Sequence, residues 1–447
     1  MKLLRLKITD AAGFRSLPFG FEHHFRTEWT LQEEMANPDG FAPFVCAGPN
    51  GSGKSNLLEA LAAIFFQLEV KRVRSSFLPE VLQDEGLDFS PVAFELDYLI
   101  QVPPEYRRPD GPVWAKVGVW KKAGESVRFQ WENQADFDTD PYEAFKGGHA
   151  DILLPQYVVG YSSGQNEILS LPFFKLRFVQ FDEYWNALTQ RLSYPGHPET
   201  RLAFLDSSFS QAILLCNLLF DDDATLRPFR EDVGVEALNE FRIILRRSIE
   251  ISRDDAERLG APIERGQFPT KQAFIDYDSP IQYDADTGRY RLNLLKLLEG
   301  DERSALAVSA LKRCATLSYH DIVTDTLILD YWINDATKAA FRDNFNRSPL
   351  ELFQAFQVLL ALNLYSVSDA LKKHLYTSTS HYVSETVPTL ASDQRIMRFK
   401  HFYFTKRGVP APMLLKELSD GEFQLLHSLG MCLLFRGTNS LFLLDEP

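Results

Sequence analysis

Residues 48–55 combine glycines, a lysine and a serine at a spacing that suits the binding of a phosphate group. The segment is Gly-Pro-Asn-Gly-Ser-Gly-Lys-Ser. Its glycines allow the backbone to wrap around a phosphate with the N–H groups turned inward. Lys54 adds a positive charge beside the β- and γ-phosphates, and the Ser55 hydroxyl is a ligand for Mg²⁺. The sequence therefore predicts a nucleotide-binding loop. The predicted nucleotide contacts are Gly48, Asn50, Gly51, Ser52, Gly53, Lys54, Ser55 and Asn56.

Two apolar segments flank this loop and are expected to hold it in place. Phe44–Ala47 is long enough for a buried strand, and the apolar residues of 56–66 recur at helical spacing. A strand–loop–helix unit directs the helix N-terminus, with its unpaired N–H groups and partial positive charge, at a bound phosphate. The alternative is a glycine-rich turn that carries a lysine by chance, and the flanking pattern disfavours it.

The last residues of the chain form a second group that suits phosphate chemistry. An apolar run, Leu441–Leu444, ends in Asp445 and Glu446. A buried strand would carry these carboxylates to the edge of a sheet, where Mg²⁺ and the γ-phosphate would lie. Asp445 is then the candidate for the Mg²⁺ shell, and Glu446 is the candidate general base for the attacking water. Taken alone, the pattern equally fits a buried strand that ends in an acidic turn.

A third motif, Leu418–Glu422, precedes the acidic strand by about one helix and a turn. Ser419 and Glu422 have the Ser-x-x-Glu spacing of a capping box, which is a common way to begin a helix. A helix N-terminus with a serine hydroxyl, and with Gly421 permitting close approach, is also a good γ-phosphate site. The two interpretations are compatible.

These motifs together resemble those of one family. Gly48–Ser55, Leu418–Glu422 and Leu441–Pro447 resemble the phosphate loop, the signature motif and the second acidic motif of ABC-type ATPases. The form of the loop resembles the RecF/SMC/OLD branch, and Gly13–Leu17 is similar to the N-terminal phenylalanine–arginine element of that branch. Residues 44–63 also resemble ATPases encoded beside bacterial restriction systems.

The resemblance implies an ATP sandwich in which two heads close on two ATP molecules and open after hydrolysis. It implies ATP and Mg²⁺ as ligands, and Lys54 and Glu446 as the catalytic residues. Ser419 and Gly421 would complete the site of the opposing subunit. The chain is accordingly expected to form a homodimer or a higher oligomer.

Two switch residues of the family have no secure counterpart here. Gln165, in a polar glycine-rich turn, is the candidate for the glutamine that senses the γ-phosphate, and an ordinary loop glutamine is the alternative. Members of the family continue past the acidic pair to a contacting histidine, whereas all nine histidines here lie upstream of Asp445. Either the sequence ending at Pro447 is a piece of a longer protein, which we expect, or its hydrolysis is impaired.

The expected fold class is α/β, an ABC-type ATPase head with a β-rich lobe, a large compact helical insertion and no long coiled coil. Residues 1–168 are predicted to be the N-terminal half of the head, with the phosphate loop and the β-rich lobe. Residues 169–390 are predicted to be a mainly helical insertion, and 391–447 the C-terminal part of the head. The helices predicted in the insertion are Phe173–Leu192, Ser207–Phe220, Val235–Ile249, Ser304–Leu317, Ile322–Phe341 and Leu350–Leu375.

The composition is that of a globular protein, with 45% hydrophobic and 24% charged residues among 447. We find no membrane span, no secretory signal and no Cys-x-x-Cys pair among the four cysteines, so we expect a cytoplasmic protein that needs no membrane. A net charge of −14 argues against broad wrapping of DNA, but a local basic groove is compatible with it. Five short basic clusters could form such a groove, or they are solvated surface patches: Lys71–Arg74, Arg107–Arg108, Lys121–Lys122, Arg246–Arg247 and Arg395–Lys400.

The leading hypothesis is an ATPase that dimerises on ATP and regulates a DNA-directed activity in bacterial defence or repair. Its effector would be a partner such as a nuclease, since we find no metal-dependent nuclease constellation, and double-stranded DNA is a candidate partner. The alternative is a nucleotide-gated oligomeric scaffold with little or no hydrolysis. A transporter subunit is disfavoured by the large predicted insertion.

Overall fold

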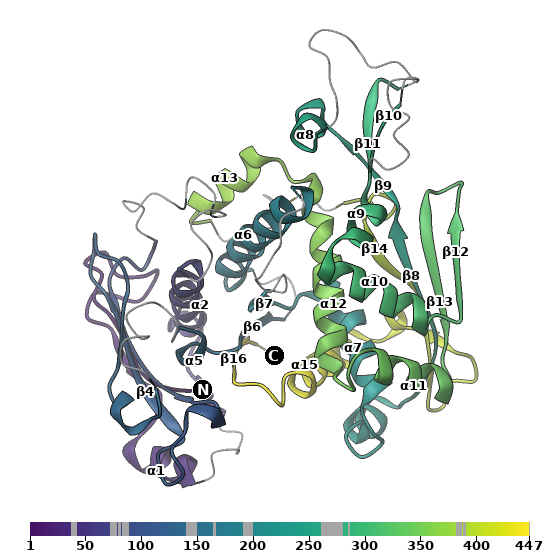
Figure 1. The fold of residues 1–447 in the computed structure, drawn as a ribbon. Coiled ribbons are helices and arrows are strands. Elements are labelled where there is room, and N and C mark those ends of the chain that lie inside the picture. Colours follow the sequence, from purple (N-terminus) through teal and green to yellow (C-terminus); the bar gives the residue numbers. More distant parts are fainter. Residues whose placement is uncertain are drawn as a thin grey trace.

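The chain has a mixed α/β fold with several separate sheets (Figure 1). The computed structural model describes residues 1–36, 43–71, 78, 82, 89–139, 150–163, 167–190, 200–260, 280–284, 287–380, 387 and 390–446. The longest helix in these ranges has 20 residues. The α/β expectation is therefore confirmed at this level, while the division at residues 168 and 390 stays a prediction.

The first sheet is antiparallel, has five strands in the order β2-β1-β3-β4-β5, and is packed against α2. Its alternating burial, as in Phe94–Gln101, leaves one face in the core and one partly exposed. A hairpin turn joins β4 to β5, where Glu125 N–H donates to Lys122 O at 2.9 Å. The bounds are β1 (Lys2–Ile8), β2 (Glu22–His24), β3 (Phe94–Gln101), β4 (Trp114–Lys121), β5 (Arg128–Trp131), and for the helix below them α1 (Glu28–Ala36).

The second sheet is parallel and central, with the order β16-β6-β7. Every residue of β6 is buried, as expected for a parallel strand covered on both faces by helices. Two long apolar helices, α2 and α6, pack against each other and on this sheet. The bounds are β6 (Tyr157–Ser162), β7 (Leu202–Phe204), β16 (Ser440–Asp445), α2 (Lys54–Val70), α5 (Ala150–Leu153) and α6 (Ser170–Thr189).

A third sheet, antiparallel with the order β12-β13-β8-β14-β15, lies on the other side of the molecule (Figure 1). One face of its central strands carries Phe241, Ile243 and Leu245, all buried against helices. The bounds of the strands are β8 (Val235–Arg246), β12 (Leu317–Asp321), β13 (Thr326–Trp332), β14 (Met397–Lys406) and β15 (Met413–Leu414).

Two helices predicted inside residues 169–390 are wrong. Residues 235–246 form strand β8, and the first part of 322–341 forms a hairpin turn and β13. Both segments contain several β-branched and aromatic residues, which favour strands. They pair with each other, and β8 also pairs with β14. Residues 169–390 therefore contain strands as well as helices in the part described, and the insertion itself stays a prediction.

The helices of this region surround the third sheet and connect it to the central one. The remaining helices are α7 (Ser210–Phe220), α8 (Arg253–Arg258), α9 (Leu294–Gly300), α10 (Glu302–Cys314), α11 (Asp335–Asn344), α12 (Pro349–Ala361), α13 (Asp369–Thr377) and α15 (Asp420–Leu434). A small sheet, ordered β10-β11-β9, projects beside α8 and includes the antiparallel pair β10/β11 (Figure 1). Its strands are β9 (Ser248–Ile251), β10 (Ile281–Asp284) and β11 (Arg289–Asn293).

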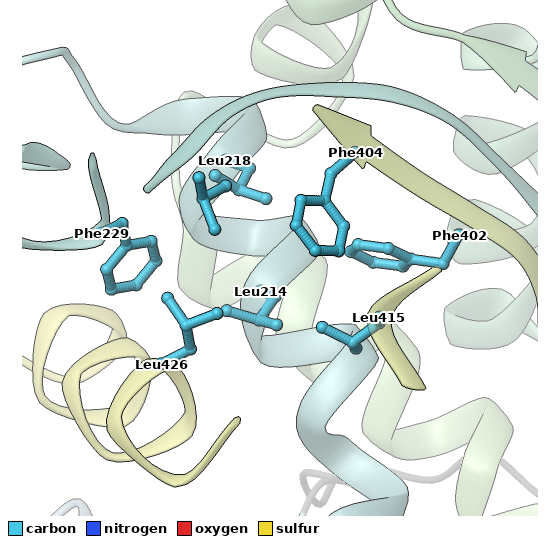
Figure 2. A pocket seen from close by; sticks show the side chains of 8 residues that line it. Leu214, Leu218, Phe229, Phe402, Phe404, Leu415 and Leu426 are labelled. Carbon is cyan, nitrogen blue, oxygen red and sulfur yellow. The ribbon is translucent and has the colours of Figure 1, made fainter. Parts of the chain in front are cut away.

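The buried apolar residues form two cores, one around α2 and the first sheet and one around α7 and the third sheet. A small cavity lies in the second core between α7, α15 and β14 (Figure 2). Its lining is entirely apolar, so it offers a water or a nucleotide no hydrogen bond. The cavity is a packing feature and lies in the core that excludes the phosphate loop.

The helices of the described ranges include no single one that is both long and apolar enough to cross a membrane. One bent pair, Pro349–Ser366 with Asp369–Thr377, passes the same test by length and composition when taken together.

Candidate functional site

The predicted phosphate loop leads into α2 through a left-handed glycine. Gly53 is the N-cap of α2 with φ 89°, and Gly51 has φ 80°, a backbone region that suits glycine. A Cβ on Gly53 would lie 3.1 Å from Ser16 Oγ, so the close approach of that residue also requires glycine. With no capping side chain at Gly53, the first N–H groups of α2 remain directed at the loop. This is the helix end that the sequence predicted for phosphate binding.

The strand predicted before the loop is wrong. Residues 43–50 have no regular secondary structure, and Val45 is 79% exposed. The Phe44 ring instead packs edge-on against Phe25, with ring centroids 5.2 Å apart, and against His23. The apolar run is thus partly accounted for by an aromatic contact with the first sheet rather than by pairing within the central sheet.

Ser55 and Asp445 meet although 390 residues separate them in sequence. The Ser55 hydroxyl donates to Asp445 Oδ1 at 2.9 Å, and the Ser162 hydroxyl donates to Oδ2 at 3.4 Å. Asp445 is only 5% exposed, and it ends β16 beside the end of β6 in the parallel pair. The start of α2 therefore lies beside the carboxyl edge of the central sheet, and Ser55 and Asp445 lie together there, as the sequence predicted.

Ser162 is a member of this cluster that the sequence reasoning missed. It is the last residue of β6, directly opposite Asp445 in the register. Ser162 could have been singled out from the sequence, because it lies where an apolar run ends and the polar segment 163–167 begins. The sequence does not reveal that Ser162 and Asp445, which are 283 residues apart, pair in parallel register.

Lys54 folds back onto the loop. Its ammonium donates to Gly48 O at 2.9 Å and to Pro49 O at 3.0 Å. Ser52 N–H donates to Pro49 O at 3.2 Å, which closes a turn over residues 49–52. The cation thus lies within the loop, where an anion held by the backbone N–H groups would meet it.

The N-terminal Gly13–Leu17 element is packed on the start of α2. Arg15 forms an ion pair with the buried Glu59 at 2.8 Å, and Ser16 Oγ donates to Asn56 Oδ1 at 2.6 Å. Asn56 also donates to Glu59 at 3.4 Å. The element therefore fixes the first turn of α2, and its polar side chains position Asn56, one of the predicted contacts.

Glu446 follows the cluster directly and is exposed. Its φ is 49°, a left-handed conformation that is uncommon for a side chain other than glycine and that is found at functional sites. Gln165, the candidate sensor of the γ-phosphate, lies outside the residues that the structure describes.

Ser419 and Gly421 lie at the N-terminus of α15, and both are exposed. The capping box is present: Ser419 Oγ accepts from Glu422 N–H at 3.4 Å, and Glu422 accepts from Ser419 N–H at 3.1 Å. Lys406 bonds to Glu422 at 2.5 Å and holds its pKa below the ordinary value. Within the described ranges no hydrogen bond links Ser419 to the phosphate loop of the same chain, so both residues face outward.

One histidine lies close to the central sheet, and its contacts are structural. His427 Nε2 lies 2.8 Å from Leu205 O, which can only accept, so Nε2 carries the proton. The hydroxyl of Ser210 therefore donates to Nδ1 at 2.8 Å. Burial lowers the pKa of His427 to about 4 and keeps the ring neutral. This residue supports the packing of α15 and is not a phosphate contact.

The oxygen donors at Ser55 and Asp445 fit a magnesium ion, which prefers one or two carboxylates completed by phosphate oxygens and water. In the part of the chain that is described, no group of three or more His, Cys, Asp or Glu side chains forms a protein-only metal site. Comparisons of the chain with protein families, with curated proteins and with solved structures found no match.

Proposed function

We propose that this chain is an ABC-type ATPase that binds ATP with Mg²⁺ at the phosphate loop and hydrolyses it. The observation that carries the proposal is the hydrogen bond between Ser55 and Asp445. It places the two oxygen donors expected at a magnesium ion at the carboxyl edge of a parallel sheet, beside the N-terminus of a helix. Two motifs that were chosen independently in the sequence thus meet at one point.

The residues of the site divide the chemistry among them. The backbone N–H groups of 50–55 and the Lys54 ammonium bind the phosphates, and Lys54 exchanges its bonds to Gly48 O and Pro49 O for phosphate oxygens. Ser55 and Asp445 hold the magnesium ion, which neutralises charge on the β- and γ-phosphates. Glu446, at the exposed end of the strand, orients the attacking water as a general base.

The second half of each site is proposed to come from another copy. Ser419 and Gly421 are exposed at the capped N-terminus of α15, and over the described residues no hydrogen bond joins them to the phosphate loop of their own chain. A helix N-terminus that carries a serine suits a γ-phosphate, so two chains would enclose two nucleotides between them. We further propose that this closure regulates a DNA-directed activity supplied by a partner such as a nuclease.

The test is steady-state ATP hydrolysis with and without double-stranded DNA, on the wild-type chain and on Glu446→Gln. We expect DNA-stimulated turnover in the wild type and a decrease of roughly 100-fold or more in Glu446→Gln, because general base catalysis contributes factors of this order. Glu236→Gln is the matched control, since Glu236 is exposed on β8.

Two outcomes would contradict the ATPase. If Glu446→Gln hydrolyses ATP like Glu236→Gln, Glu446 is not the base. If the wild type binds ATP tightly without turnover, the nucleotide-gated scaffold is the better account.

A further inference from the structure

Two basic segments that are far apart in sequence lie side by side in the third sheet. Strand β8 ends in Arg246, and strand β14 carries Arg398 and Lys400. Their antiparallel register places Arg398 opposite Ile244, and Arg246 N–H donates to Ile396 O at 2.7 Å. Arg395 immediately precedes this pairing. We call Arg246, Arg395, Arg398 and Lys400 the arginine cluster.

The arginine cluster lies on the face of the sheet opposite the one that packs against helix α12. Side chains alternate along a strand, so Ile244 and Arg246 lie on the same face as Arg242. The register adds Arg398, opposite Ile244, and Lys400, opposite Arg242, to this face. The opposite face is the core, where Leu245 and Met397 are 1% and 0% exposed. Lys400 is exposed, and the three arginines are half-buried.

The three guanidinium groups bond to main-chain carbonyls and not to carboxylates. Arg246 Nη1 donates to Asp393 O at 3.1 Å, Arg395 Nε donates to Leu390 O at 3.2 Å, and Arg398 Nη1 donates to Ser392 O. Over the residues described, none of the three arginines forms an ion pair, and Arg398 Nε is buried without a hydrogen-bond partner there. The carbonyls orient the groups, and the carboxylate that acts on Arg398 is that of Asp393.

The charges of the cluster act on one another. Burial lowers the pKa of Arg398, the carboxylate of Asp393 opposes this, and the positive charges of Arg246 and Arg395 add to it. Gathering like charges on half-buried strands is unfavourable unless an anion offsets them. By contrast, Arg242 on the same face is paired with Asp330 through two hydrogen bonds. Arg242 is thus bonded directly to a carboxylate, whereas the arginines of the cluster are bonded to main-chain carbonyls.

We propose that the arginine cluster binds the phosphate backbone of double-stranded DNA. Arginine side chains fixed by carbonyl bonds present their remaining N–H groups to phosphate oxygens, and such contacts position a protein on DNA irrespective of sequence. The chain carries a net charge of −14, so most of its surface repels DNA and a local positive face decides where contact occurs. This inference rests on the DNA-directed part of the proposed function.

The cluster is separate from the phosphate loop. Strands β8 and β14 belong to the third sheet, on the opposite side of the molecule from α2 (Figure 1). Helix α12 packs on β14 from the core side, so the cluster surface and the loop face different regions. DNA binding at the cluster therefore leaves the ATP site open to a second copy of the chain.

The test measures the affinity for a fluorescently labelled DNA duplex by anisotropy over a series of salt concentrations. The variants are Arg246→Gln/Arg398→Gln and, because these residues also hold main-chain bonds, the single variant Lys400→Glu at the exposed position. The control is Arg128→Gln/Arg227→Gln, which removes the same charge from two other exposed arginines. Thermal unfolding of each variant reports on its folding.

We expect the double variant of the cluster to bind about tenfold or more weakly. The slope of log affinity against log salt should become shallower by about 2, because each of the two arginines neutralises one phosphate. Lys400→Glu should weaken binding in the same direction, and the control should bind like the wild type.

Binding by the cluster variants that equals the control overturns the inference while leaving the ATPase proposal intact. The inference also fails if the cluster binds a protein-like polyanion and not DNA. The cluster variants would then bind polyglutamate more weakly than the wild type but bind DNA equally well. A wild-type chain that hydrolyses ATP but binds no duplex at low salt overturns both the cluster and the DNA-directed role. A chain that binds DNA through the cluster but neither binds nor hydrolyses ATP refutes the ATPase alone.

Discussion

At the scale of single residues, the site depends on a carboxylate and a hydroxyl supplied by opposite ends of the chain. Asp445 is buried and accepts hydrogen bonds from Ser55 and Ser162. A carboxylate that is oriented by two hydroxyl groups at the start of a helix is well placed to hold a divalent cation. The role of Asp445 can therefore be separated from that of the loop itself.

Asp445→Asn should reduce the contribution of Mg²⁺ to ATP affinity by about tenfold or more, because the amide has the same size and keeps one acceptor oxygen but lacks the charge that attracts the cation. Titration of ATP with and without Mg²⁺ measures this difference. Asp110→Asn, at an exposed position of the first lobe, is the control. An unchanged dependence on Mg²⁺ in Asp445→Asn would count against the assignment.

His427 makes the stability of the fold depend on pH. Its folded pKa of about 4 lies below the ordinary 6.5, so below pH 6.5 the unfolded chain binds a proton that the folded chain does not. The stability contribution is complete above pH 6.5 and falls as the pH drops towards 4, by roughly 2 kcal/mol at pH 5. Urea unfolding of the wild type and of His427→Gln at pH 7.5 and pH 5 gives the comparison. Equal pH dependence of the two chains would refute this role.

At the scale of elements, α15 carries two glycines with different duties. A Cβ on Gly430 would lie 2.7 Å from Ile213 Cγ2 of α7, whereas a Cβ on Gly421 would meet nothing within 4 Å. Gly430→Ala should thus lower the free energy of unfolding by about 1–3 kcal/mol through overpacking. Gly421→Ala should change it by less than about 0.5 kcal/mol.

The same pair separates stability from assembly. Since Gly421 is proposed to approach the nucleotide of a second copy, Gly421→Ala should weaken ATP-dependent dimerisation while leaving urea unfolding unchanged. If Gly421→Ala dimerises like the wild type, Gly421 has no close contact across the interface.

The agreement between sequence and structure differs from element to element. The strand β16, the helix α2 and the capping box of α15 were all predictable, because each has a local pattern of apolar spacing or a capping residue. Strand β8 was mistaken for a helix, since its partners β13 and β14 lie far away in sequence and impose the strand period through pairing. The segment at 44–47 was mistaken for a strand because its aromatic partner, Phe25, cannot be read from a local apolar run.

In the candidate site, too, local patterns were predictable and tertiary contacts were not. Ser55 and Asp445 were predictable as chemistry, from residue types in known spacings, whereas Ser162 and the packing of Gly13–Leu17 on α2 depend on tertiary contacts. The arginine cluster could not be predicted as a unit, because its members come from two strands whose register the sequence does not state.

At the scale of the whole molecule, the phosphate loop and the N-terminus of α15 are proposed to be two half-sites. In this proposal the loop end of α2 binds one nucleotide, and the exposed Ser419 contacts the nucleotide of another chain. The two cores keep these half-sites on one folded unit, since α15 packs on α7 and leads directly into β16. The central claim is that two copies complete each other.

The most direct test is analytical ultracentrifugation of Glu446→Gln with and without ATP and Mg²⁺, alone and combined with either Lys54→Ala or Ser419→Arg. We predict an ATP-dependent dimer for Glu446→Gln and monomers for each combined variant. An equimolar mixture of the two combined variants should dimerise again, because one intact site forms from the Lys54 of one chain and the Ser419 of the other. A mixture that stays monomeric, or a Ser419→Arg chain that dimerises fully on its own, would contradict the composite site.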